Sequence, residues 1–265
     1  MDAVAKPRSS ANASQSLHRA FVLLRVVAGA GVAGIRLSDA AAQAGLHVAT
    51  AHRLLAGLLR ERAVSFDPYS RLYHLGHGFL EMRYHTREHQ IRLLFRPVLE
   101  RIGALTEDTV HLSTSTGNDA LCIDRVEGTF PIRANTLDVG ARRPLGVGAG
   151  SLALLAALPE ARAHLVMRAN EERYAQYRGL EPDEIRVLVE QARRAGYAFN
   201  SARIIDGVSG VGVAIPDGAG NAVAAVSVAA ISERLPPARQ RQIAGWIHEE
   251  AGKLSLPAAP TLHST

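Results

Sequence analysis

A single glycine between two alanine-rich runs constrains the fold of this chain more than any other feature. Residues 37–62 read LSDAAAQAGLHVATAHRLLAGLLRER, and Gly45 interrupts an otherwise helical composition. Glycine inside a helix costs about 1 kcal/mol relative to alanine, which disfavours one continuous helix. Glycine also accepts a positive φ, and Ala41, four residues earlier, is small enough for two helices to cross closely. The pattern predicts a helix over 37–44, a corner at Gly45 and a helix over 49–60.

The segments on either side of this corner complete a recognisable order of elements. Residues 16–29 place apolar side chains at helical spacing, whereas residues 1–15 are small and polar and are expected to form a disordered tail. Residues 64–75 alternate in polarity around the turn sequence DPYS, which predicts a β-hairpin. Three helices followed by a hairpin predict a winged helix-turn-helix domain over residues 16–75, and an ordinary helical hairpin is the alternative.

Positive charge is concentrated in the same part of the chain. Residues 1–90 contain 11 Lys and Arg against 6 Asp and Glu, whereas residues 91–265 contain 19 of each. A basic module joined to a larger neutral one is typical of nucleic-acid binding combined with a second function, although a solvated basic face accounts for the charge equally well. Together with the helix order, this predicts double-stranded DNA as a partner.

The candidate DNA contacts lie where a recognition helix begins and on the hairpin. The first residues of such a helix normally meet base edges or phosphates in the major groove. Ser38 or Asp39 is expected to cap the preceding helix, and Leu54, Leu55 and Leu58 are expected to face inward. The predicted DNA-binding residues are Ser38, His47, Val48, Ala49, Thr50, His52, Arg53, Tyr69 and Arg71.

The second half of the chain predicts an α+β domain with a mostly antiparallel sheet. Residues 76–90 are predicted to form a linker helix, Pro97 to open or break a helix, residues 91–255 to form the domain, and residues 256–265 to form a tail. The predicted strands are residues 109–116, 119–128, 131–140, 207–217 and 221–232. The predicted helices are residues 151–158, 160–169, 182–196 and 236–254.

Several classes of protein are disfavoured by what the sequence contains. The single cysteine, Cys122, allows no internal disulfide and no cysteine-based zinc site, and the longest apolar runs are shorter than a membrane span. We therefore expect a cytoplasmic protein without membrane association, metal or cofactor. His111, Cys122 and Asp124 could be imagined as a nucleophile and its base, with Cys122 and Asp124 on one strand face. A lone cysteine beside apolar residues is more often part of a core, and no catalytic residues are predicted.

A glycine-rich turn at the start of a predicted helix is the most informative chemical feature. The sequence PLGVGAGSLALL places Gly146, Gly148 and Gly150 there, so unpaired backbone N–H groups and the positive helix end could hold a carboxylate. No G-K-[ST] follows, which excludes a Walker loop. The alternative is that the glycines only allow close packing.

The order of these parts resembles the IclR family of bacterial transcriptional regulators. The resemblance rests on the helix-turn-helix segment with its wing FDPYSRLYHLG, on DRVEG, on GARRPLGVGAGSLALLAALP, on RAGYAFN and on GVSGVGVAIPDGAGNAVAAVSVAA. It implies a winged helix-turn-helix, a linker helix used in dimerisation and a GAF-like effector-binding domain. Dimers or tetramers of such proteins bind palindromic DNA sites, and a small organic acid or aromatic metabolite alters their activity.

The resemblance also implies positions for the effector. They are Gly148, Ala149, Asn200, Gly210, Ser227 and Ala229. Members that bind small keto acids tend to have aspartate, cysteine and serine where this chain has Asn200, Gly210 and Ala229. A roomier, less polar pocket is therefore expected, and with it an effector larger than glyoxylate or pyruvate, such as an aromatic acid.

These observations predict a ligand-responsive transcriptional regulator of a catabolic operon, acting as repressor or activator and as a homodimer or tetramer. Two alternatives remain: an architectural DNA-binding protein that senses nothing, and an enzyme with a DNA-binding module.

Overall fold

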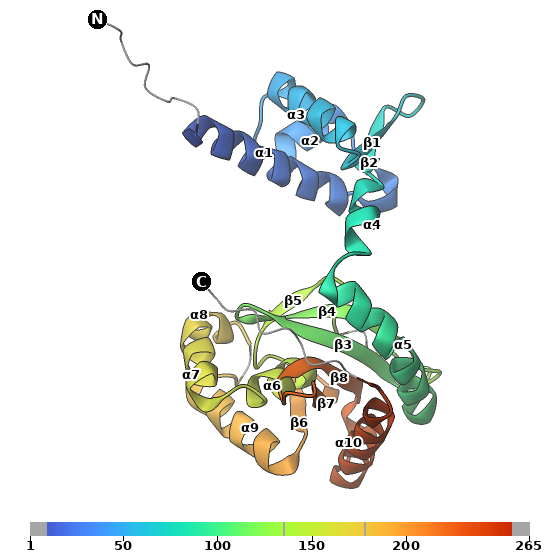
Figure 1. The fold of residues 1–265 in the computed structure, drawn as a ribbon, viewed down its shortest axis with the longest axis vertical. Coiled ribbons are helices and arrows are strands. Elements are labelled where there is room, and N and C mark those ends of the chain that lie inside the picture. Colours follow the sequence, from blue (N-terminus) through green and yellow to red (C-terminus); the bar gives the residue numbers. More distant parts are fainter. Residues whose placement is uncertain (1–9, 135, 178, 256–265) are drawn as a thin grey trace, which may run out of the picture. The chain divides into compact units, whose positions relative to one another are not determined.

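The chain forms two compact units, Met1–Thr86 and Arg87–Thr265. The computed structural model describes residues 10–134, 136–177 and 179–255, shown as coloured ribbon in Figure 1. The predicted tails over residues 1–9 and 256–265 lie outside the described residues. The described elements of the first unit are α1 (Ser10–Gly29), α2 (Leu37–Gln43), α3 (Val48–Arg60), β1 (Val64–Asp67), β2 (Leu72–Leu75) and α4 (Gly78–Arg83).

The predicted corner between α2 and α3 is confirmed. Gly45 has a φ of +63°. Its N–H donates to the Ala42 carbonyl at 3.1 Å, while the N–H of Leu46 donates to the Ala41 carbonyl at 2.9 Å. These two bonds form a Schellman motif, which satisfies the last carbonyls of α2 and turns the chain. Ala41 is buried where the two helices meet, as its small size predicts, and Ala51 of α3 is buried as well.

Three local expectations in this unit are wrong. First, α1 begins at Ser10, so residues 10–15 belong to a helix and not to a tail. Second, the N-cap position of α2 is Arg36, which makes no side-chain cap, and Ser38 lies inside the first turn. Its hydroxyl donates to the Asp39 carboxylate at 3.2 Å instead of to the helix backbone.

The third is the predicted single linker helix over residues 76–90. The structure has α4 and, separately, α5 (Arg87–Thr106). The Thr86 hydroxyl donates to the Arg83 carbonyl at 2.9 Å, which offers the backbone an alternative to a further helical turn. Pro97 lies inside α5 without ending it. Because proline has no N–H, the Leu93 carbonyl lacks its usual helical donor. Leu93 and Pro97 are both exposed, so water can donate to this carbonyl instead.

The second unit is built on an antiparallel sheet with strand order β5-β4-β3-β8-β7-β6. The strands are β3 (Thr109–Thr116), β4 (Asp119–Val126), β5 (Arg142–Pro144), β6 (Ala198–Ile205), β7 (Val208–Pro216) and β8 (Ala222–Ile231). Helices α5 and α10 (Pro237–Gly252) cover one face of the sheet (Figure 1). The other face carries α6 (Ala149–Ala156), α7 (Glu160–Ala169), α8 (Glu171–Tyr174) and α9 (Pro182–Ala195). The predicted α+β class with an antiparallel sheet is confirmed.

Residue alternation along the central strands separates the core from the opposite face. On β8, Val226 and Val228 belong to the core under α5 and α10, so Ser227 and Ala229 point toward α6. On β3, Leu112 belongs to the same core, so His111 and Ser113 point the other way. Both faces of the sheet carry an apolar core, and on the α6 side polar residues of the central strands leave room for a site.

One predicted strand is wrong, and two strands, β5 and β6, were not predicted. None of the described residues in 131–140 is in a strand, and the short β5 follows instead. The apolar residues that suggested alternation there, Ile132 and Val139, are exposed and do not contribute to a core. Strand β6 was not predicted, because its pairing with β7 is interrupted between Asn200 and Ile205 and its polarity does not alternate regularly.

Candidate functional site

The first candidate site is the exposed side of α3. His47 occupies the N-cap position, so the helix begins at Val48, one residue earlier than predicted. His52 and Arg53 are exposed one turn further on, and Thr50 is partly buried. None of the described carboxylates pairs with Arg53, so its charge is available to a phosphate or a base.

The hairpin presents a second group of predicted residues. The Asp67 carboxylate accepts hydrogen bonds from the Tyr69 N–H at 2.9 Å and the Ser70 hydroxyl at 2.6 Å, which fixes the turn and lowers the pKa of Asp67. Tyr69 is 97% exposed, and Arg71 is exposed with a φ of +59°. The turn thus holds an aromatic ring and a guanidinium group in solvent at the tip of the hairpin.

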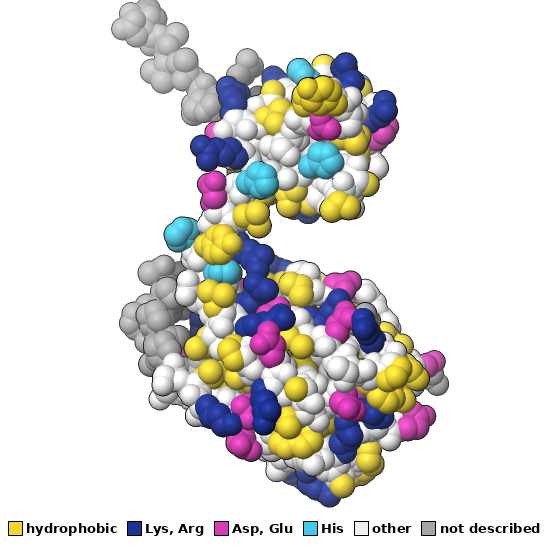
Figure 2. All heavy atoms as spheres, turned by 90° about the vertical axis from the view of Figure 1, so that its right-hand side faces the viewer, with side chains coloured by type: hydrophobic (Ala, Val, Ile, Leu, Met, Phe, Trp, Pro, Cys, Tyr) yellow, Lys and Arg dark blue, Asp and Glu magenta, His cyan; other side chains and the backbone are white. Residues whose placement is uncertain are grey.

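Ser38 is the predicted DNA contact that the structure favours least. Its hydroxyl donates a hydrogen bond to the exposed Asp39 carboxylate, and the negative charge of Asp39 repels phosphate. Two exposed arginines of the same unit, Arg36 and Arg60, were not among the predicted contacts, although the local charge excess could have suggested them. Figure 2 shows Lys, Arg and His side chains spread over the visible face of this unit.

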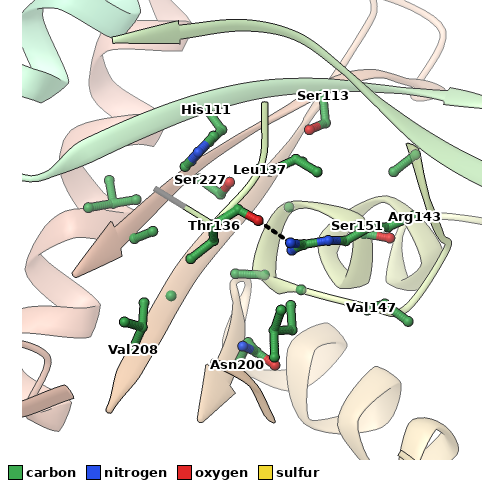
Figure 3. Close-up of a pocket in the computed structure, with 18 of the residues that line it drawn as sticks. His111, Ser113, Thr136, Leu137, Arg143, Val147, Ser151, Asn200, Val208 and Ser227 are labelled. Atoms are coloured by element: carbon green, nitrogen blue, oxygen red, sulfur yellow. Dashed lines mark hydrogen bonds between the residues drawn. The ribbon is translucent and has the colours of Figure 1, made fainter. Parts of the chain in front are cut away.

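The second candidate site is a pocket between the sheet and the start of α6, drawn in Figure 3. All six predicted effector positions line it. Asn200, Gly210 and Ala229 are register partners across β6, β7 and β8. Ser227, Gly148 and Ala149 complete the six. Further lining residues are His111, Ser113, Thr136, Leu137, Arg143, Val147, Ser151, Ile204, Val208 and Ser209.

Glycines let the first turn of α6 approach the sheet. A Cβ on Gly212 would lie 2.4 Å from the Ala149 carbonyl oxygen, and a Cβ on Gly150 would lie 2.9 Å from the Ser227 hydroxyl oxygen. A larger residue at Gly212 would therefore push the helix away from β7. The close approach brings the helix start directly onto the polar face of the sheet.

The turn before α6 has the geometry of an anion site. Gly146 and Gly148 have φ values of +105° and +96°, which only glycine adopts readily. The N–H groups of Gly148 and Ala149 have no partner inside the helix, and none of the described residues supplies another acceptor. The Ser151 hydroxyl accepts from the Gly146 N–H at 3.0 Å and donates to the Pro144 carbonyl at 2.8 Å, which holds the turn in place.

Arg143 on β5 supplies the only guanidinium group that lines this pocket among the described residues, and it was not among the predicted effector positions. It donates to the Thr136 carbonyl (Figure 3) and is not paired with a carboxylate of the described chain. Its Nη1 lies 3.6 Å from the position a Cβ on Gly148 would occupy. Burial lowers the pKa of Arg143, so the cation is held in a partly dehydrated place without a counter-charge.

His111 is the second polar group that sequence reasoning did not assign to the pocket. Its side chain is buried, and its Nε2 atom has no hydrogen-bond partner within the part of the chain that the structure describes. Burial, with the nearby charges of Arg125 and Arg143, lowers the pKa of His111 to about 4, so the ring is neutral at pH 7. Neither Arg143 nor His111 belongs to a sequence motif for binding, so only their positions in the folded protein reveal them as pocket residues.

The expectation of a roomier, less polar pocket rests on Asn200, Gly210 and Ala229 alone and stays a prediction. Arg143 and His111 add charge and polarity that this expectation left out. The hollow has a volume of about 550 Å³, including the part open to solvent.

The arrangement does not favour nucleophilic catalysis. A β-bulge sets Asp124 opposite Leu112 and Cys122 opposite Ser113, so the two side chains lie on opposite faces and not on one face as expected. Burial raises the pKa of Cys122 to about 11, and Asp124 is paired with Arg92 at 3.3 Å and Arg96 at 3.2 Å.

Among the described residues, no group of three His, Cys, Asp or Glu side chains could hold a metal ion. Within the same residues, no helix combines the length and apolarity that crossing a membrane requires.

Two family models match the chain, in the order of its two units. The IclR helix-turn-helix domain matches residues 16–68, and the C-terminal domain of the bacterial transcriptional regulator IclR matches residues 84–256. The fold is that of a two-domain helix-turn-helix regulator of transcription. The chain belongs to the IclR family.

Proteins similar to this chain include regulators of transcription. The chain is 24% identical to the transcriptional repressor AllR of Klebsiella pneumoniae over 93% of its length and 91% of that protein. It is 29% identical to the glycerol operon regulatory protein of Streptomyces coelicolor over 83% and 86% of the two chains. The fold matches an IclR homologue of Microbacterium hydrocarbonoxydans, solved with 4-hydroxybenzoate, with a TM-score of 0.74, 23% identity and coverage of 89% and 99%.

Proposed function

We propose that this protein regulates a catabolic operon by binding operator DNA and that a small carboxylic acid alters this binding. The observation that carries the proposal is Arg143, a partly buried cation without a carboxylate partner among the described residues, beside the N–H groups of Gly148 and Ala149. A carboxylate would receive hydrogen bonds and charge from both. The homologue solved with 4-hydroxybenzoate, itself a carboxylate, is consistent with this class of effector.

The DNA-binding half of the proposal rests on α3 and the hairpin. Val48, Ala49, His52 and Arg53 would enter the major groove, and Tyr69 and Arg71 would contact the flanking backbone. A protein that binds bacterial operator DNA acts in the cytoplasm. The pocket is proposed to sense and not to catalyse, because Cys122 and Asp124 lack the activation that catalysis needs.

The first experiment measures binding of the purified protein to its own upstream intergenic DNA at a stated salt concentration, with and without aromatic and aliphatic carboxylic acids. One protected palindromic site whose occupancy changes with one acid is the expected result. Salt-sensitive binding without sequence preference would favour an architectural protein. Turnover of an acid would favour an enzyme.

A matched pair of arginine variants tests the pocket. Arg143→Met removes the guanidinium from the pocket, whereas Arg142→Met changes the exposed neighbour on the same strand. Both variants should bind the operator, and only Arg143→Met should lose the response to acids. Equal loss in both, or retention in Arg143→Met, would contradict the assignment.

We further propose a homo-oligomer. Leu17 and Phe21 on α1 and Leu80 and Met82 on α4 are exposed apolar side chains of the same unit, and such exposure is typical of a protein interface. Light scattering should give a dimer or tetramer for the natural chain and a smaller species for Phe21→Asp. Val32→Asp, at a fully exposed site of the same unit, is the control and should not dissociate.

A further inference from the structure

His111 places a buried ring nitrogen in the wall of the pocket. The side chain is 3% exposed, and its Nε2 has no partner among the described groups. The Leu137 backbone favours the protonated form of the ring, so we infer that the single proton of the neutral imidazole lies on Nδ1 and is donated to that backbone. A neutral imidazole with its proton on Nδ1 has a lone pair on Nε2, and only a donor can satisfy it.

We propose that the effector is an acid with two polar ends: a carboxylate held by the α6 turn and Arg143, and a hydroxyl or N–H group that donates to His111 Nε2. This inference rests on the proposed function and deepens it by naming the ligand class. A simple acid without a donor would leave a buried acceptor unpaired, which weakens binding.

The two ends of the site lie close enough for one small molecule. His111 on β3 is the register partner of Ser227 on β8, so about 5 Å separates their backbones. Ser227 in turn lies against the α6 turn, because a Cβ on Gly150 would come 2.9 Å from its hydroxyl oxygen. Figure 3 shows His111, Ser227 and Arg143 around the same space. A compact hydroxy acid can therefore reach both ends.

The pocket lining also contains apolar side chains. They are Ala120, Leu137, Val147, Ile204 and Val208. A hydrocarbon or aromatic body in the effector could pack against them.

The test compares matched acids by titration calorimetry with the full-length protein. The acids are benzoate, 3-hydroxybenzoate, 4-hydroxybenzoate, 4-aminobenzoate and 4-methoxybenzoate, together with butyrate and 4-hydroxybutyrate. At least one acid with a donor should bind about 10-fold or more tightly than its partner without one. The methoxy acid, which has no donor, should bind no better than benzoate.

Two substitutions separate the two ends of the site. His111→Phe should abolish the preference for hydroxy acids while the plain acid still binds. Arg143→Met should lower the affinity for hydroxy and plain acids by the same factor. His111→Gln, which keeps a side-chain carbonyl as acceptor, should retain part of the preference. If neither His111 variant folds, nitrogen-15 NMR of labelled histidine in the natural protein replaces them. The Nε2 resonance should then shift with the hydroxy acid and not with the plain acid.

The two proposals fail in different ways. Equal affinity for hydroxy and plain acids, a preference that survives in His111→Phe, or an Nε2 resonance that does not respond would each overturn the two-ended ligand while leaving an acid sensor. No binding of any acid at millimolar concentration by protein that still binds its operator would overturn the acid sensor itself.

Discussion

His111 on β3 lies directly opposite Ser227 on β8, so the two side chains project from the same face of the sheet. Their neighbours Leu112 and Val226 project from the other face into the core. Because the pocket side chains and these core side chains project from opposite faces, the pocket residues can be exchanged without removing this part of the core.

The buried His111 should make folding stability depend on pH. Its pKa is about 4 in the folded protein, lowered mainly by burial and also by Arg125 and Arg143, and the ordinary value is 6.5. A base with a lowered folded pKa stabilises the protein above pH 6.5, and this contribution is lost as the pH falls toward 4. Between pH 7.5 and pH 5 the loss should be on the order of 2 kcal/mol. Urea unfolding at both pH values, for the natural protein and His111→Asn, measures it. An equal pH effect in both proteins would contradict the assignment.

Arg53→Ala should weaken binding to the operator much more than binding to unrelated DNA. Arg53 is exposed on α3 without an ion-pair partner among the described residues, and an arginine bidentate to guanine contributes about 1 to 3 kcal/mol of discrimination. Arg62→Ala is the control, because Arg62 is 3.4 Å from Glu81 and lies after α3. Fluorescence anisotropy with both DNAs at one salt concentration gives the ratio. Equal losses on both would mean that Arg53 contacts only phosphate.

Ala41→Leu should destabilise the first unit by about 1 to 3 kcal/mol, because a larger side chain does not fit between α2 and α3. Ala41 is 1% exposed, whereas its neighbour Ala42 is exposed and provides the control substitution Ala42→Leu. Thermal unfolding followed by circular dichroism distinguishes them. If Ala42→Leu were the more damaging change, the assigned helix crossing would be wrong.

Gly148→Val should abolish the acid response. Gly148 has a φ of +96°, and a Cβ there would lie 3.1 Å from Ile204 Cδ1. A β-branched residue in such backbone costs about 1 to 3 kcal/mol and displaces the N–H groups that face the pocket. Gly220→Val in the turn between β7 and β8 has a similar φ of +85° with open space around it. That control should lose stability and keep the response. A folded Gly148→Val protein with full response would refute the anion site.

The helix-turn-helix could be predicted because its determinants are local. Gly45, Ala41 and the spacing of apolar residues around them fix the corner within one short segment. The gathering of Asn200, Gly210 and Ala229 depends on pairing between separate strands, and only the family resemblance suggested it.

Arg143 shows what the sequence could not reveal. Its importance comes from its surroundings in the fold, where the partly buried guanidinium group has no carboxylate partner among the described residues. The β-bulge between Leu112 and Ser113 is a similar case, because a register shift reverses the faces of Cys122 and Asp124 without a sequence marker. Strand pairing therefore decides both which groups meet and which do not.

The Ser151 hydroxyl should control acid affinity without contacting the acid. It accepts a hydrogen bond from Gly146 and donates one to Pro144, and both bonds hold the turn that presents the Gly148 and Ala149 N–H groups. Ser151→Ala removes both bonds, so the turn is no longer preorganised and acids should bind about 10-fold more weakly. Thr106→Val is the control, because it also removes a buried hydroxyl bond, at 2.8 Å to Ile102, but lies outside the pocket. Calorimetric titration with one acid should show the loss only in Ser151→Ala, although both variants lose stability. Equal affinity in the two variants would mean that the turn holds its shape through the glycine backbone alone.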